Sequence, residues 1–202
     1  MSEGNLSTVN DSTPSAKAGV AHFVIDTRAS RFTVQAFAAG LLSAMGHNPT
    51  IAIAKFTGEA DFDTETAEGS GFRLTVQAAS LSVQDDISDK DRREMERVMK
   101  EDVLEVTRYP EIRYEASAIA CSRLDHALYS ATLNGQLSLH GVTRVQTITA
   151  RIAVLGEMLR ASGNCTLRQS DYQIKLVSVA AGALKVKDEL KFSFEMIARR
   201  QE

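Results

Sequence analysis

The sequence predicts an all-β protein, built as a single antiparallel, lipocalin-like barrel of roughly eight strands with one long amphipathic helix between strands. Three observations lead to this fold class. Segments that alternate apolar and polar residues with a period of two recur along most of the chain, as in strands with one dry face. Turn residues separate these segments, and only one stretch has helical spacing. The length of 202 residues suits one domain.

The alternation is clearest in six segments, residues 31–38, 72–78, 112–118, 129–140, 145–154 and 190–196. Every second residue in each of them is apolar, apart from Gln146 on the corresponding face of 145–154, so that one face of the strand is dry. Turns are expected where Gly, Pro, Asn and Ser gather, at residues 48–49, 68–71, 140–141 and 161–164. About eight strands close a barrel whose interior is filled by side chains or holds one ligand.

The helix is predicted over residues 86–106. Ser88 or Asp89 can cap its start, and Pro110 requires it to end before Tyr109. The charged face of this segment is best explained as a solvated surface, since residues 85–105 carry nine acidic and five basic side chains. The opposite face is a stripe with helical spacing that is expected to turn toward the barrel: Met95, Val98, Met99, Asp102, Val103 and Val106.

The overall charge argues against nucleic acid as a partner. The chain has 23 basic and 26 acidic residues, a net charge of −3, so it has no basic field to attract phosphates. Residues 32–54 form a run of 23 residues without charge, long enough to span a bilayer. Gly40, Pro49 and several polar residues interrupt this run. We therefore expect no membrane span, but two strands joined at the mouth of the barrel.

The ends of the chain and its cysteines indicate a compartment. Residues 1–19 are rich in Ser, Thr, Asn and Gly and are expected to form a disordered tail before a barrel domain over residues 20–200. This tail does not have the apolar block of a secretory signal, so a cytoplasmic location is expected. Cys121 and Cys165 are expected to be free, half-buried thiols, which fits a reducing compartment.

A series of short motifs has an informative order. After the opening strand at residues 22–37 come segments 56–63 and 79–81, then the helix, and then Tyr-Pro-Glu-Ile-Arg-Tyr-Glu-Ala-Ser at residues 109–117. Gly-Gln-Leu-Ser-Leu-His-Gly-Val-Thr follows at residues 135–143, and segments 167–174 and 186–190 complete the series. In this order the motifs resemble the YceI-like family of polyisoprenoid-binding, lipocalin-like proteins. The resemblance covers residues 22–200, although the His that family helices often carry is missing near Met95.

The resemblance implies a protein that binds, carries or sequesters an isoprenoid amphiphile, such as a quinone or a prenyl phenol or phosphate, in the lumen of the barrel. It implies no enzyme activity and no cofactor, and it suggests a homodimer. The physical chemistry agrees, because an isoprenoid tail has no hydrogen-bonding groups and needs a dry tube. Each buried methylene contributes about 0.8 kcal/mol.

The candidate binding residues form two groups. His47, which follows the uncharged run, and the hydroxyl of Tyr114 are placed to meet a polar head group. The others are apolar residues that serve either as the ligand wall or as packed core, two roles that a sequence does not separate: Phe32, Val34, Phe56, Phe72, Leu74, Leu137, Leu139, Phe192 and Phe194.

Two other function classes stay open at this point. One is an enzyme that modifies a lipid or quinone with His47 as acid or base, although no known catalytic motif is present. The other is an interaction module, with a solid barrel and the charged helix as its docking face. A metal site is not expected, because His47 and His140 have no third ligand at an ordinary spacing.

Overall fold

The structure is a computed structural model that describes residues 19–39, 48–63, 70–117, 119–179 and 184–201. Within these ranges, twelve strands form one sheet and three short strands form a second. The predicted N-terminal tail lies outside the described residues up to residue 18. In the described part of the chain, no helix is both long enough and apolar enough to cross a membrane.

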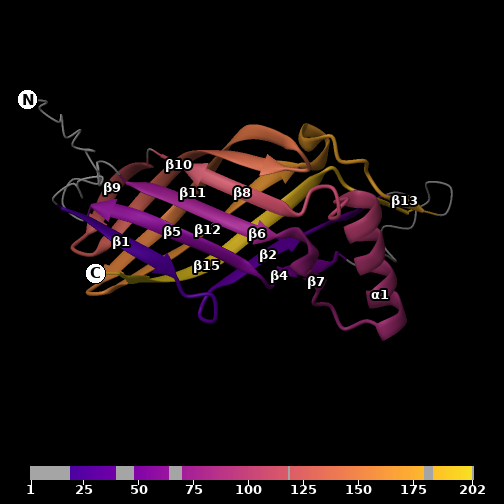
Figure 1. The fold of residues 1–202 in the computed structure, drawn as a ribbon, viewed down its shortest axis with the longest axis horizontal. Coiled ribbons are helices and arrows are strands. Elements are labelled where there is room, and N and C mark those ends of the chain that lie inside the picture. The colour runs from indigo at the N-terminus through magenta and orange to yellow at the C-terminus, as the bar shows by residue number, and fades with distance from the viewer. Residues whose placement is uncertain (1–18, 40–47, 64–69, 118, 180–183, 202) are drawn as a thin grey trace, which may run out of the picture.

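Eight strands of the large sheet close into an antiparallel barrel (Figure 1). Each strand pairs with the next in the order β1-β5-β6-β8-β10-β11-β12-β15, and β15 pairs back with β1. The predicted fold class is therefore confirmed. The barrel strands are β1 (Val20–Ile25), β5 (Phe56–Asp63), β6 (Gly71–Gln77), β8 (Glu111–Ala116), β10 (Leu128–Leu139), β11 (Val142–Leu155), β12 (Met158–Arg168) and β15 (Glu189–Arg200).

Additional strands extend the wall at both ends of the barrel. β15 pairs with β1 along one half and with β2 (Arg31–Gln35) along the other, and β4 (Thr50–Ile53) and β7 (Leu81–Val83) continue from β2. β2 and β4 come from the two ends of the uncharged run and are neighbours, as predicted. β9 (Ile119–Asp125) pairs with β10. The second sheet contains β13 (Ser178–Val179), β14 (Leu184–Val186) and β3 (Ala38–Ala39).

One expected turn is wrong. Residues 161–164 lie in the middle of β12, where Ala161 pairs with Ile152 on one side and with Met196 on the other. The chain turns earlier, at Gly156, whose φ is +61°. The small residues mark crowding instead, because a Cβ atom on Gly163 would lie 2.4 Å from the carbonyl oxygen of Thr149. The turn expected at residues 140–141 is present, with positive φ at both positions.

The helix is shorter than the sequence predicted. α1 runs over Asp89–Val98 and continues as a π-helical turn over Met99–Val103. Ser88 caps its start, since the Ser88 hydroxyl accepts a hydrogen bond of 3.1 Å from the backbone N–H of Asp91. The helix ends before Val106 because Glu105 adopts a left-handed conformation with φ +45°, which turns the chain toward β8.

α1 lies across one end of the barrel, at the far end from the C-terminus (Figure 1). Polar side chains attach it to β7, which is the last strand on its side of the sheet. The Arg92 guanidinium donates to the carbonyl oxygens of Val83 and Asp85, and the Glu96 carboxylate accepts from the Val83 N–H at 3.0 Å. Burial acts to raise the pKa of Glu96, but the Val83 N–H and Lys100 outweigh it and lower that pKa. The helix thereby satisfies an exposed strand edge.

Candidate ligand site

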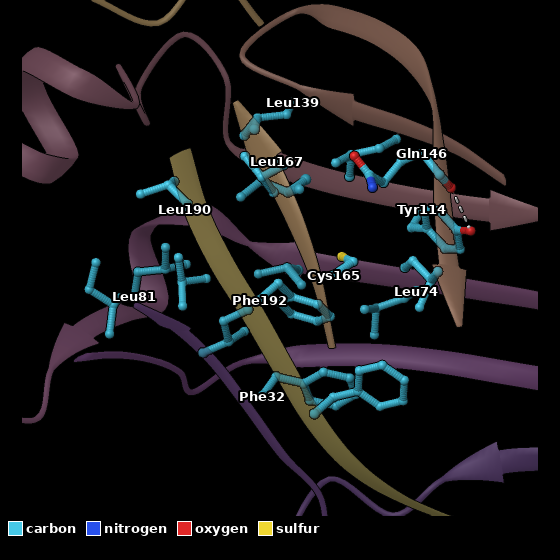
Figure 2. A pocket seen from close by; sticks show the side chains of 18 of the residues that line it. Phe32, Leu74, Leu81, Tyr114, Leu139, Gln146, Cys165, Leu167, Leu190 and Phe192 are labelled. Carbon is cyan, nitrogen blue, oxygen red and sulfur yellow. Dashed lines mark hydrogen bonds between the residues drawn. The ribbon is translucent and has the colours of Figure 1, made fainter. Parts of the chain in front are cut away.

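The barrel encloses a cavity of about 460 Å³ that extends to the end covered by α1. Its volume lies in the range of pockets that hold a small molecule. Figure 2 shows Phe32, Leu74 and Phe192 from three different strands around this space. The interior is thus hollow, which separates it from the solid barrel of the interaction-module alternative.

Most of the predicted wall residues border the cavity. Phe56 does not: it is buried behind Phe32, with ring centroids 4.7 Å apart in an edge-to-face contact. Its place is the core, because it packs against the Phe32 ring and is buried without bordering the cavity. His47 lies outside the described residues. The predicted residues that line the cavity are Phe32, Val34, Phe72, Leu74, Tyr114, Leu137, Leu139, Phe192 and Phe194.

The aromatic residues form a continuous patch on one side of the cavity. Phe192 and Phe194 are two residues apart on β15, so both point inward, and their ring centroids are 5.8 Å apart. Each stacks on Phe32, at 6.1 and 6.2 Å respectively. At the far end, Phe62 and Leu159 form the floor, and the Phe62 ring contacts Tyr129 edge-to-face at 5.2 Å.

Sequence reasoning missed part of the wall at the level of single residues. The stripe of α1 does turn toward the cavity, but its members were not counted as binding residues. The i, i+3, i+4 spacing of the apolar residues in this helix is the sequence signal that identifies its lining residues. The apolar lining residues contributed by α1 and its π turn are Met95, Val98, Met99 and Val103, and further strand residues include Ile148, Ala150, Ile152, Ala161 and Met196.

The charged side chains among the described lining residues of the wall are all acidic. Among its described residues there is no Lys and no Arg, and its two ionisable carboxylates are Asp61 and Glu94. Asp61 lies 2.8 Å from the imidazole of His22, and Glu94 lies 2.8 Å from the Arg97 guanidinium. The hydrogen bond from Arg97 lowers the pKa of Glu94. A ligand in this lumen meets no cationic side chain among the described residues.

The Tyr114 hydroxyl belongs to the wall and not to the free surface of the lumen. It lies 3.0 Å from the carbonyl oxygen of Gln146 (Figure 2) and 3.1 Å from that of Leu133, and it accepts a hydrogen bond from the Gly135 N–H. Burial raises the pKa of Tyr114 to about 12. Its ring lines the cavity, while its hydroxyl ties β8 to β10 and β11.

His140 lies in the turn between β10 and β11. Its Nε2 lies 3.2 Å from a carboxylate oxygen of Glu105, its Nδ1 lies 3.2 Å from the Tyr172 carbonyl oxygen, and its ring contacts Tyr109. The side chain is 9% exposed, so it is turned away from solvent. It does not line the cavity. The described residues contain no group of side chains suited to hold a metal ion.

Stability is expected to fall at alkaline pH because of Cys165, whose thiol borders the lumen. Burial raises the pKa of Cys165 from 9.0 to about 11, so the folded state holds this proton more tightly than the unfolded state. The stabilisation is complete below about pH 9 and is lost as the pH rises toward 11. We expect a loss of about 1–2 kcal/mol over this window, measured by urea unfolding.

The control for this experiment is Cys165→Ala, which lowers stability by a constant amount but removes the thiol. The pH-dependent loss between pH 9 and 11 is expected to shrink in this variant. A slope identical to that of the original protein would show that the Cys165 thiol does not cause it.

Comparison with known proteins adds an independent line. The model of the YceI-like domain matches residues 15–198. Similar solved structures include Burkholderia cenocepacia BcnA, with TM-score 0.64, 21% identity and coverage of 86% of this chain and 98% of that one. A polyisoprenoid binding domain from Saccharophagus degradans has TM-score 0.62, 12% identity and coverage of 89% and 98%. The Campylobacter jejuni YceI protein has TM-score 0.57, 17% identity and coverage of 78% and 88%. No curated protein matches the chain.

Proposed function

We propose that this chain, which belongs to the YceI-like domain family, binds the isoprenoid chain of an amphiphile inside its barrel and carries or sequesters it. The observation that carries this proposal is the hollow, apolar lumen of about 460 Å³. A similar structure comes from a domain described as polyisoprenoid binding, which supports the same class of ligand.

The energetics of such a site favour a long hydrocarbon. An isoprenoid tail makes no hydrogen bonds, so it loses none when it leaves water for a wall of Phe, Leu, Ile and Val side chains. Each methylene that it buries contributes about 0.8 kcal/mol, against the cost of ordering the chain. Several isoprene units therefore suffice for firm binding without any specific polar contact.

The head groups expected from the sequence differ in charge. A prenyl phosphate brings an anion to a wall that has no basic side chain among its described residues, and the two carboxylates that border it are already paired with His22 and Arg97. A quinone or prenyl phenol brings no charge. The wall therefore favours the uncharged heads, because an anion would lose its hydration without gaining a cationic partner.

Mass spectrometry of the natively purified protein tests the proposal. We expect organic extracts of the protein to contain a prenyl lipid in amounts comparable to the protein itself. A protein stripped of lipid is expected to regain one equivalent when a prenyl alcohol such as farnesol is added. Empty extracts, combined with no uptake of farnesol in calorimetric titration, would contradict the proposal.

The other expectations from sequence remain predictions. The enzyme alternative depends on His47, which lies outside the described residues, so binding is the function proposed here. A cytoplasmic location, expected from the N-terminal residues, and a homodimer, suggested by the family resemblance, are also proposed. Fractionation of cells and light scattering of the pure protein are the respective measurements.

A further inference from the structure

The barrel wall is split along part of its length. The ladder between β11 and β12 runs from Leu155↔Met158 to Thr149↔Asn164 and ends there. Beyond that point, residues 142–148 of β11 pair with β10, while residues 165–168 of β12 pair with β15. The two strands therefore separate toward the end of the barrel that α1 covers.

The side chains of Gln146 and Leu167 fill this split. Both border the lumen, and both also border a small polar pocket on the outer side of the wall. Thr166, Arg168, Asp171 and Glu189 complete the outer pocket. The lumen and the outer pocket are thus separated here by these side chains and not by a hydrogen-bonded ladder.

The amide of Gln146 has a defined orientation. Its Nε2 donates to the carbonyl oxygen of Thr166 at 3.3 Å, across the split, and to that of Thr147 at 3.1 Å. Since both neighbours are carbonyl oxygens, the reversed amide would place oxygen against oxygen. The Oε1 atom is left as an acceptor, and no described residue donates to it.

A second amide acceptor lies close along the chain. Gln169 follows β12 directly, lines the lumen and is 5% exposed. Its Nε2 donates to the carbonyl oxygen of Lys187 at 2.9 Å, and no described residue donates to its Oε1. This oxygen, like that of Gln146, is therefore available to accept a hydrogen bond from a ligand that donates one.

We propose that the split between β11 and β12 is the head-group site, and that Gln146 and Gln169 select an uncharged head that donates a hydrogen bond. Such heads are hydroxyls, as in a prenyl alcohol, a prenyl phenol or a quinol. An oxidised quinone offers only carbonyl acceptors, and a diphosphate brings several negative charges to a pocket that holds Asp171 and Glu189 against the single cation Arg168. The inference rests on the proposed function, since the tail must occupy the lumen.

Four ligands with the same fifteen-carbon tail test the selection: farnesol, farnesyl methyl ether, the parent hydrocarbon and farnesyl diphosphate. The ether keeps the oxygen but not the donated proton. We expect calorimetric titration to show farnesol binding about three- to tenfold more tightly than the ether, the effect of one neutral hydrogen bond, and farnesyl diphosphate binding weakest of the oxygen-bearing ligands.

Gln146→Leu is expected to reduce this preference, and Gln146→Leu combined with Gln169→Leu is expected to remove it, so that farnesol and the ether bind alike. Gln136→Leu is the matched control, because Gln136 is exposed on the outer face of the neighbouring strand β10, and it should keep the full preference. Equal binding of farnesol and ether to the original protein, or tightest binding of the diphosphate, would overturn the head-group site alone. Failure of all four ligands to bind would instead overturn the proposed function.

A measurement without mutation locates the head group. Amide NMR spectra recorded with farnesol and with its methyl ether should differ at the side-chain amides of Gln146 and Gln169 and at residues 145–149 and 164–168. Differences centred on Glu94 and Met95 of α1 would place the head group at the helix and contradict the inference.

Discussion

Replacing Cys165 with phenylalanine is expected to weaken isoprenoid binding about 100-fold while leaving the barrel at least as stable as before. Cys165 lies on β12 opposite Phe192 and borders the lumen, so a larger ring at this position occupies space that the ligand would use. Displacing about four methylene units from the wall costs about 3 kcal/mol of binding, which is about two orders of magnitude in affinity. Calorimetric titration with farnesol measures the loss.

The matched control is Asn164→Phe, one residue earlier on the same strand. Asn164 is exposed, because successive residues of a strand face opposite sides of the wall. The same ring placed there should leave the affinity unchanged. Equal losses in the two variants would mean that the ring acts on the strand and not on the lumen, and unchanged binding in Cys165→Phe would place the ligand elsewhere.

Replacing Gly135 with alanine is expected to lower the free energy of unfolding by about 3 kcal/mol. A Cβ atom at this position would lie 2.4 Å from Cζ of Tyr114 and 2.6 Å from the carbonyl oxygen of Glu115, so the ring or the backbone must move. Movement of the ring also breaks the hydrogen bonds of the Tyr114 hydroxyl to β10 and β11. The midpoint of thermal unfolding should fall by about 6–12 °C.

Gly71→Ala provides the comparison, since Gly71 also lies in a barrel strand. Its added Cβ would be 3.5 Å from the nearest atom, the carbonyl oxygen of Ala116, which is an ordinary contact. We expect this variant to change the stability by less than about 1 kcal/mol in either direction. Comparable losses in the two variants would attribute the effect to glycine in a strand and not to the space taken by Tyr114.

The alternation of residues was sufficient to predict much of the fold. On β8, β10 and β15 the predicted apolar faces point into the barrel, because a period of two leaves only two choices of face and water selects between them. The helical stripe of Met95, Val98 and Met99 was likewise identified, and its orientation toward the lumen was expected. The apolar faces of strands and helices depend on residues only two to four positions apart, which is why the sequence alone can indicate them.

Where local signals misled, a distant neighbour was the cause. Small residues at 161–164 resemble a turn, but Gly163 is small because Thr149, from another strand, crowds it. The helix stops early because Glu105 turns the chain into reach of the His140 ring, 35 positions away. For Phe56 the sequence allows either ligand wall or packed core, and only its edge-to-face contact with Phe32 favours the core.

The sequence by itself determined that this protein is a β-barrel with a dry interior and one amphipathic helix. Only the tertiary structure decided that the interior is hollow, since packed core and ligand wall require the same apolar side chains and differ in the space left between them. It also decided where polar groups meet that space. Gln146 borders both the lumen and the outer pocket where β11 and β12 separate. The alternation within a strand does not specify which strand it pairs with or where that pairing ends.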